Sequence, residues 1–252
     1  MRRRKWLAVI AVILAAVAFI FIRTYDGRPG AIPSAEEAAA AINQYEPEAD
    51  AEVVLDRIRL DDRQLFVPYV SGRGTHGMGF LKWEKGEWKV TRVDPGGSPE
   101  LRILDHSNPS ERYIVWNINP QEQMEQIRFY LIRERNAGMS SGIYYYTPRV
   151  QMEETADLTK RPYGALPFPE DWADILREEK RMNQALPGGV LDQLFSGMPS
   201  RHAMLQMGWF PDYAEDAPPP RGYSKSGDED TEFLWILDEP NLEKPGLTTG
   251  ED

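Results

Sequence analysis

Ser140 is the residue whose setting most resembles that of a catalytic nucleophile. It lies at the centre of Gly138-Met139-Ser140-Ser141-Gly142, which has the spacing of a nucleophile elbow. An elbow requires a strand, a sharp turn and a helix, whereas residues 143–146 are strand-forming. His202 lies downstream of several aspartates, so the chain order of a serine hydrolase triad is met. Ser140 and His202 are therefore candidate catalytic residues on chain order alone.

A glycine-rich segment suggests a second kind of chemistry, the binding of an anion. Residues 72–77, Gly-Arg-Gly-Thr-His-Gly, match the glycine spacing of dinucleotide-binding loops. In those loops the last glycine opens a helix whose N-terminus holds the pyrophosphate, but residues 78–83 predict a strand here. We therefore expect a hairpin loop, which can still offer backbone N–H groups to a small anion. The expected ligand-binding residues are Arg73, Gly74, His76 and Gly77.

Metal and cofactor ligands show no pattern in this sequence. The chain contains no cysteine, which excludes disulfides, thiolate zinc sites and a cysteine nucleophile. Its three histidines, His76, His106 and His202, form no pair at helical spacing. The acidic segment 228–232 resembles part of a calcium loop, but it lacks the turn glycine and the later glutamate. We expect no metal and no cofactor, and we interpret 228–232 as a solvated acidic loop, with loose divalent-cation binding as the alternative.

The N-terminus has the pattern of a membrane anchor. Basic residues at 2–5 precede 17 consecutive apolar residues, 6–22, of which eleven are Leu, Ile, Val or Phe. A helix of this length spans about 26 Å, close to the thickness of the hydrocarbon core. The excess of positive charge before the helix predicts a cytoplasmic N-terminus, with the bulk of the chain extracytoplasmic. A cleaved signal sequence is the alternative, with a site at residues 16–18, but four apolar residues follow that site directly.

The charge balance limits the partners of the outer portion. Five of the 29 basic residues and none of the 40 acidic residues precede residue 24, so the rest of the chain carries a formal charge of −16. Such a surface argues against nucleic acid as a partner, because phosphate binding needs a basic surface. It is also repelled by anionic bilayers and wall polymers unless cations intervene. The expected partners are the lipid bilayer, through residues 6–22, and an envelope protein or glycan.

After a linker at residues 24–33, the sequence predicts an α+β fold that begins with a helix. Ser34 and Glu37 have the spacing of a capping box, and the helix is expected to stop near Pro47. The clearest hairpin is 80–93, in which a two-residue turn at 85–86 places Trp83 opposite Trp88. Further strands are expected at 53–55, 58–60, 65–70, 101–104, 112–117, 127–133 and 143–147. Segment 121–135 can alternatively be helical, because its apolar residues recur every three or four positions.

A more helical or irregular segment is expected at 161–237. Residues 171–183 predict a helix with Trp172, Ile175 and Leu176 on one face, and 190–195 predict a second short helix. The apolar run 233–237 predicts a strand that ties the C-terminus to the sheet, followed by a polar tail at 238–252. The resulting division is a basic stub and anchor at 1–23, the linker, a strand-rich α+β domain at 34–160, the segment 161–237, and the tail.

Aromatic side chains in the predicted strands provide a possible contact surface. Alternation along a strand places Tyr144 and Tyr146 on one face and Tyr145 on the other. Most aromatic residues are expected to pack in the core. The exposed remainder can form a platform for glycan or peptide.

The helix and the meander that follows it, residues 34–94, resemble the cystatin-like and NTF2-like architectures. The likeness rests on the capped helix and on the hairpin ending Gly86-x-Trp88-Lys89-Val90. The whole chain resembles uncharacterised single-pass extracytoplasmic proteins of Gram-positive bacteria, and this resemblance implies no catalytic residues. We therefore expect a membrane-anchored extracytoplasmic protein with a non-catalytic binding or assembly role at the cell envelope. The alternative is an envelope hydrolase acting on glycan or ester bonds.

Overall fold

The computed structural model describes residues 28–140, 143–185, 205–218 and 228–243, which form two compact units that divide after Pro95. Both units combine short helical segments with largely antiparallel sheet, so the predicted α+β class is confirmed. Within the described ranges no helix has the length and apolarity needed to cross a bilayer. The predicted anchor at 6–22 lies outside those ranges.

Unit 1 begins with helix α2, Ala35–Tyr45, whose start is fixed by the predicted capping box. The Ser34 hydroxyl accepts a hydrogen bond from the Glu37 backbone N–H at 3.1 Å, and the Ser34 N–H donates to the Glu37 carboxylate at 2.7 Å. These two bonds satisfy backbone donors that a helix start otherwise leaves open. The helix buries Ala38 and Ile42 against the sheet and stops two residues before Pro47.

The sheet of unit 1 is an antiparallel meander in the order β1-β3-β4-β5, with β2 also paired to β3. Its strands are β1 Ala51–Val54, β2 Ile58–Arg59, β3 Gln64–Ser71, β4 His76–Glu84 and β5 Glu87–Asp94. Gly79 on β4 lets the helix approach closely, because a Cβ there would lie 2.7 Å from the Ile42 Cδ1 atom. The helix and one sheet face thus share a core that contains Leu65, Val67 and Leu81.

The predicted tryptophan hairpin is confirmed, and it also holds the end of the linker. Trp83 pairs with Trp88 across β4 and β5, with ring centroids 5.5 Å apart in an edge-to-face arrangement. The Trp88 Nε1–H donates to the Ala31 carbonyl at 3.0 Å, and Arg57 Nη1 donates to the Pro33 carbonyl at 2.8 Å. Residues 31–33 are therefore fixed on unit 1.

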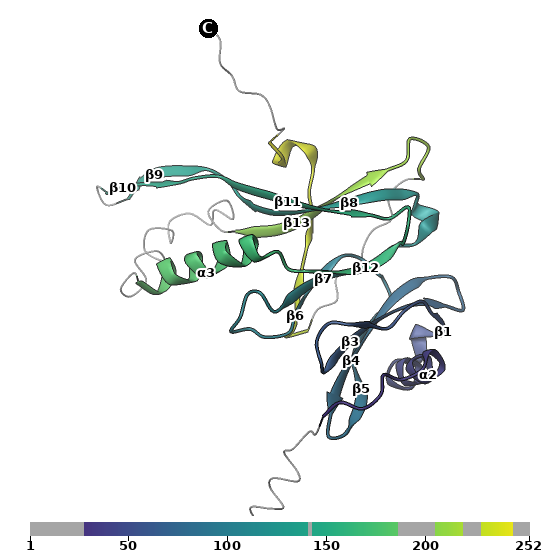
Figure 1. The fold of residues 1–252 in the computed structure, drawn as a ribbon. Helices are drawn as coiled ribbons and strands as arrows, with labels where there is room; N and C mark the ends of the chain where they lie inside the picture. Colours follow the sequence, from purple (N-terminus) through teal and green to yellow (C-terminus); the bar gives the residue numbers. More distant parts are fainter. Residues whose placement is uncertain (1–27, 141–142, 186–204, 219–227, 244–252) are drawn as a thin grey trace, which may run out of the picture. The chain divides into compact units, whose positions relative to one another are not determined.

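Unit 2 is built from two four-stranded sheets (Figure 1). The first has the order β12-β7-β6-β14, from Tyr163–Pro167, Arg112–Asn117, Glu100–Ile103 and Thr231–Phe233. The second has the order β11-β8-β13-β15, from Val150–Asp157, Met124–Arg133, Gln206–Tyr213 and Trp235–Ile236. All of these pairs are antiparallel except the short β13–β15 pair.

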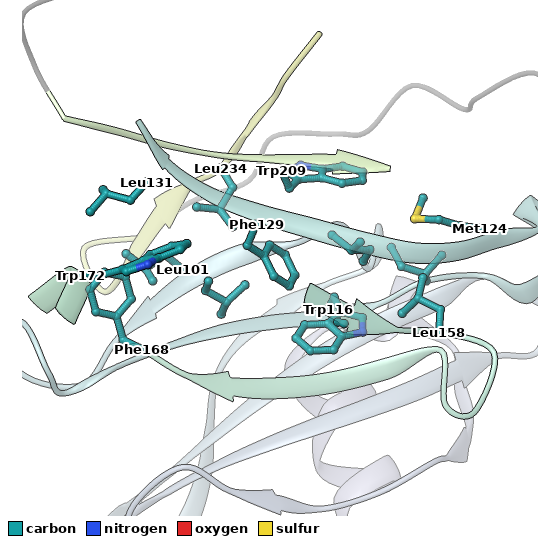
Figure 2. Close-up of a cluster of buried hydrophobic side chains, with 14 of the residues drawn as sticks. Leu101, Trp116, Met124, Phe129, Leu131, Leu158, Phe168, Trp172, Trp209 and Leu234 are labelled. Atoms are coloured by element: carbon teal, nitrogen blue, oxygen red, sulfur yellow. The ribbon is translucent and has the colours of Figure 1, made fainter. Parts of the chain in front are cut away.

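A continuous apolar core fills the space between these sheets, as Figure 2 shows. Phe129 and Trp209 from one sheet meet Leu101 and Trp116 from the other, and the rings of Trp116 and Phe129 lie 5.4 Å apart. Burying one such aromatic or aliphatic side chain contributes about 1.5–3 kcal/mol, so this cluster is the main source of unit 2's stability. Leu234, which is 1% exposed, enters the same core between β14 and β15.

Helix α3, Glu170–Ala185, covers part of this core. Trp172 and Ala173 are fully buried in the cluster, and Ile175 and Leu176 pack against it, so the predicted apolar face of the helix is confirmed. The Trp172 ring meets Phe168 edge to face at 5.7 Å. The short helix predicted at 190–195 lies outside the described residues.

A long hairpin runs out of the second sheet (Figure 1). Strands β9, Asn136–Ser140, and β10, Ile143–Thr147, pair only with each other among the described strands. They keep the register of β8 and β11. Arg133 pairs with Val150 at the end of the longer strands, and Asn136 pairs with Thr147 at the start of the shorter ones, so these residue pairs lie three positions apart on each side of the hairpin. The two strand pairs are therefore successive parts of one hairpin, and we call its described residues, 134–140 and 143–149, the arm.

The structure differs from the sequence analysis mainly between residues 120 and 213. The helical alternative for 121–135 is wrong, because Pro120–Glu122 form one 3-10 turn and β8 follows from Met124. Residues 136–138, which lie between the predicted strands 127–133 and 143–147, belong to β9, and strands β11, β12 and β13 were not predicted. The division falls at residue 95 because the strands from Glu100 onward pair with one another, in a sheet separate from that of β5.

Candidate functional site

A cavity of about 660 Å³ in unit 2 is the candidate site. Its lining comes from α3, from β7, β8 and β13, and from the segment β14–β15, which passes from one sheet to the other. The apolar part of the lining includes Leu131, Leu176, Met207, Phe233 and Trp235. Phe233 and Trp235 meet edge to face, with ring centroids 5.7 Å apart. A concave apolar surface with a few polar groups is the usual form of a small-molecule site.

A buried arginine holds the β14 wall of the cavity. Arg102 on β6 is 2% exposed, and its Nη1 donates to both carboxylate oxygens of Asp228 and to the Thr231 hydroxyl, each at 3.1 Å. Its Nη2 lies 3.6 Å from the Asp230 carboxylate. These charge-assisted contacts fix the chain just before β14, so the orientation of Phe233 and Trp235 depends on them.

The helical wall is held by a second polar cluster. Arg177 on α3 pairs with the Glu170 carboxylate at 2.8 Å and also donates to the Ser110 hydroxyl. The Ser110 hydroxyl donates to Glu170 at 2.7 Å, and this bond, followed by the Arg177 contact, lowers the pKa of the Glu170 carboxyl. Because Ser110 precedes β7, the cluster ties the start of α3 to the sheet beside it.

Arg112 is the cation positioned to receive a ligand. Its side chain is 13% exposed and lines the cavity, and its buried Nε–H finds no hydrogen-bond partner among the described residues. The Nη1 atom lies 3.9 Å from the Glu232 carboxylate, which is half exposed. The Nε atom is closed to solvent, so a carboxylate in the cavity would pair with the other nitrogens of the Arg112 guanidinium.

Glu179 on α3 lines the same cavity with altered acidity. Burial raises the pKa of its carboxyl, while Arg133 and the Leu205 backbone N–H act in the opposite direction. A carboxyl that keeps its proton more readily offers an O–H donor as well as an acceptor. His106, Lys180 and Gln206 complete the polar part of the lining, and His106 Nε2 lies 3.1 Å from the Asp230 carboxylate.

The lining as a whole suits an amphipathic anion. The aromatic pair and the leucines can hold an apolar body, while Arg112 and Lys180 supply positive charge. Two acids lie in the same lining: Glu179, whose raised pKa favours its neutral form, and Glu232, which is half exposed and lies 3.9 Å from Arg112.

The two serine hydrolase candidates are not joined in the described residues. Ser140 is the last residue of β9, and β10 begins at Ile143, so the serine stands between two strands of a hairpin. This arrangement differs from the strand, turn and helix of a nucleophile elbow. His202 lies outside the described residues, so its distance from Ser140 stays untested.

The glycine-rich segment is the turn between β3 and β4, as expected of a hairpin loop. Ser71 occupies its donors: the N–H groups of Arg73 and Thr75 donate to the Ser71 hydroxyl at 3.3 and 3.0 Å, and that of Gly74 donates to its carbonyl. Gly74 takes a φ of +78° in this turn. These backbone groups would have to leave Ser71 to bind an anion. His76 and Gly77 are already in strand β4. The turn thus presents no preformed set of backbone donors for an anion, and the ligand site stays a prediction.

The acidic segment 228–232 is accounted for by an internal partner. Its aspartates Asp228 and Asp230 face the guanidinium of Arg102, with nitrogen–oxygen distances of 3.1 and 3.6 Å. In the described part of the chain no group of three or more His, Asp or Glu side chains is placed to hold a metal ion.

Sequence reasoning did not find the cavity, because its polar residues come from five separate segments. His106, Arg112, Glu179 and Glu232 have no common spacing, and only the pairing of β14 with β6 and the packing of α3 bring them to one lining. The usable signal was the apolar run 233–237, which predicted that the C-terminal segment returns to the sheet.

The resemblance over 34–94 stays a prediction. Searches with this chain find no matching family model, no matching curated protein and no matching solved structure.

Proposed function

We propose that this chain is a membrane-anchored extracytoplasmic binding protein whose unit 2 takes a carboxylate with an aromatic or aliphatic body. The observation that carries the proposal is the cavity in which the cationic side chain of Arg112 lies in one lining with Phe233 and Trp235. A carboxylate would pair with that cation, and the apolar body would remain against the rings.

The position of unit 1 fits anchoring at the bilayer. Residues 31–33 are held on unit 1 by Trp88 and Arg57. The apolar run ends at Ile22, so the connection from the run to Gly30 consists of the seven residues 23–29. Seven extended residues span about 25 Å at most, so unit 1 stays near the membrane surface if 6–22 cross the bilayer.

A matched pair of ligands tests the binding function. Phenylbutyrate and phenylbutyramide have nearly the same shape, and only the first carries a charge. A charge-assisted hydrogen bond to Arg112 predicts that the acid binds about tenfold more tightly, as measured by calorimetry or ligand-observed NMR on the full-length protein. The preference should vanish in Arg112→Gln.

Arg73→Gln is the matched control, because Arg73 is exposed in the β3–β4 turn of unit 1. The preference should persist in this variant. Equal affinity for acid and amide in the wild type, or a preference that is lost in Arg73→Gln instead, contradicts binding at Arg112.

Protease treatment of intact protoplasts tests the topology. With a tag at the C-terminus, we expect the tag to be lost while the N-terminus stays with the membrane fraction. A protected tag would contradict the extracytoplasmic placement, and a protein found in the medium without its first residues would show cleavage of the anchor.

An envelope hydrolase is the second candidate, favoured by two carboxyl groups, Glu179 and Glu232, in one lining. The raised pKa of Glu179 suits a general acid for glycan cleavage, which needs a second carboxylate that stays ionised. A hydrolase would cleave fluorogenic glycosides or esters and would lose turnover but not binding in Glu179→Gln. Turnover that is absent in the wild type contradicts this candidate.

A further inference from the structure

The arm carries an exposed apolar face that the ligand cavity does not use. Met139, Tyr144 and Tyr146 are 61%, 82% and 63% exposed, and the register places Tyr144 opposite Met139 and Tyr146 opposite Ala137. Directly paired residues of an antiparallel hairpin point to the same side, so all four share one face. The prediction that Tyr144 and Tyr146 share a face is confirmed by this pairing.

This face continues the core-facing side of the second sheet. Ile127, Phe129 and Leu131 on β8 point into the core of unit 2, and the same alternation leads outward to Ala137 and Met139. Inside unit 2 the opposing sheet covers this side. Along the arm the described side chains of the same face are exposed.

The charges of the arm are confined to its base. Residues 136–148 are 13 consecutive uncharged residues, the longest such stretch after residue 23 in a chain of which 27% is charged. Arg133 and Arg135 precede the stretch and Arg149 follows it, with Glu134 as the single acid among them. Arg149 is paired with Glu243 at 3.4 Å, so Arg133, Glu134 and Arg135 give the base of the arm a formal charge of +1, whereas the chain beyond residue 23 carries −16.

We propose that the arm docks in the headgroup region of the phospholipid bilayer that carries the anchor. Tyrosines at the border of water and hydrocarbon are typical of membrane interfaces, and arginines beside them contact lipid phosphates. The outer edges of β9 and β10 have no strand partner among the described strands, so their backbone groups need water or headgroups. An open edge of this kind limits insertion to interfacial depth.

Local positive charge makes anionic headgroups the favoured surface for the arm in spite of the acidic chain. Attraction of basic residues to anionic headgroups acts near the surface and fades within about 10 Å at moderate salt. Arg135 lies directly before the uncharged stretch, about 13 Å of strand from Met139, the partner of Tyr144, so it contacts the phosphates when the arm lies along the membrane surface. The inference rests on the proposed anchoring of residues 6–22.

Because the chain contains no cysteine, one introduced cysteine reports on one position. Full-length protein with Tyr144→Cys, labelled with an environment-sensitive nitrobenzoxadiazole dye, is reconstituted in vesicles of phosphatidylcholine and phosphatidylglycerol. We expect emission at shorter wavelength and about a twofold loss of emission with lipids spin-labelled near the headgroup, in keeping with interfacial depth. Lipids labelled deep in the acyl chain should quench less.

Two further labels serve as controls. Val53→Cys lies on β1 of unit 1 and is 51% exposed, and its dye should show water-like emission without quenching. Asp26→Cys lies four residues after the predicted anchor, so its dye should be quenched if the anchor inserts. Quenching at 26 without quenching at 144 overturns the docking of the arm and leaves the anchor intact, whereas loss of both overturns the anchor.

A double variant tests whether the tyrosines are responsible. With the dye at Met139→Cys, Tyr144→Ser and Tyr146→Ser should remove the lipid quenching, and the exposure of both side chains means that the fold should be retained. A shift of emission at 144 without lipid quenching overturns the proposal. If that shift disappears on dilution the partner is a second copy, and if it persists the partner is another part of the same chain.

Discussion

Replacing Arg102 by methionine should destabilise unit 2 and disorganise the β14 wall of the cavity. The Nη1 atom donates three hydrogen bonds at 3.1 Å to Asp228 and Thr231, and Nη2 lies 3.6 Å from Asp230. Breaking a fully buried pair carries an energetic penalty of about 3–5 kcal/mol, but Asp228 and Asp230 are 35% and 38% exposed and keep part of their hydration. We therefore expect a loss of about 2–4 kcal/mol, or about 5–15 °C in Tm.

The assay is thermal unfolding of the full-length protein in detergent, followed by tryptophan fluorescence. Arg59→Met is the control, because Arg59 is 44% exposed and pairs at 3.5 Å with Asp62, which is 93% exposed. Exposed pairs of this kind contribute about 0–1 kcal/mol, so this variant should unfold nearly as the wild type does.

A double-mutant cycle separates the ion pair from simple loss of packing. Asp228→Asn alone should destabilise, and combined with Arg102→Met it should add little, giving a coupling energy of about 1 kcal/mol or more. Additive effects would refute the view that Arg102 anchors the segment through its carboxylates. Stabilisation of the wild type by calcium would instead support cation binding by 228–232.

Three further predictions concern packing and titration. Gly79→Ala should destabilise by about 1–3 kcal/mol, since the new methyl group meets Ile42, and Ile42→Val should recover part of that loss in denaturant unfolding. Glu179→Gln should match the wild type in stability below about pH 4.5 and exceed it at pH 7, because a carboxyl with a raised pKa loses its favourable contribution to folding as pH rises. A difference in unfolding free energy between the two proteins that stays constant from about pH 4.5 to pH 7 would contradict the raised pKa. Burial, followed by the Glu153 contact, raises the pKa of Tyr130 to about 12. Between about pH 10 and 12 the wild type should therefore lose stability that Tyr130→Phe keeps. Unfolding free energies that fall equally with pH in the two proteins would contradict the raised pKa.

Local pattern was sufficient where the stabilising contacts are also local. The capping box of Ser34 and Glu37 fixed the start of α2, and the turn at Lys85-Gly86 fixed the pairing of Trp83 with Trp88. These features depend on residues three to five positions apart, so the sequence displays them directly.

The strands that were not predicted owe their conformation to distant partners. β13 contains Gly208 and Pro211, which weaken any strand signal, yet it pairs with β8 along its whole length, and β8 lies about 80 residues earlier in the chain. β11 contains two glutamates and alternates poorly, but the continuous register of the long hairpin imposes its pairing. Strand propensity is weak compared with such pairing and burial.

The site was unpredictable for the same reason. Arg112 and Glu232 approach each other because β14 returns to β6 more than 120 residues along the chain, and Glu179 joins them because α3 packs on the core through Trp172. The motifs that the sequence did display, around Ser140 and Gly74, lie in hairpin ends, where glycine and serine are favoured by the turns themselves.

The most direct test of the binding proposal is a crystal structure of the protein with phenylbutyrate. We expect a carboxylate oxygen about 2.7–2.9 Å from an Nη atom of Arg112, with the phenyl ring against Phe233 and Trp235. A ligand bound elsewhere, or one whose carboxylate points to solvent and makes no contact with Arg112, would contradict the account.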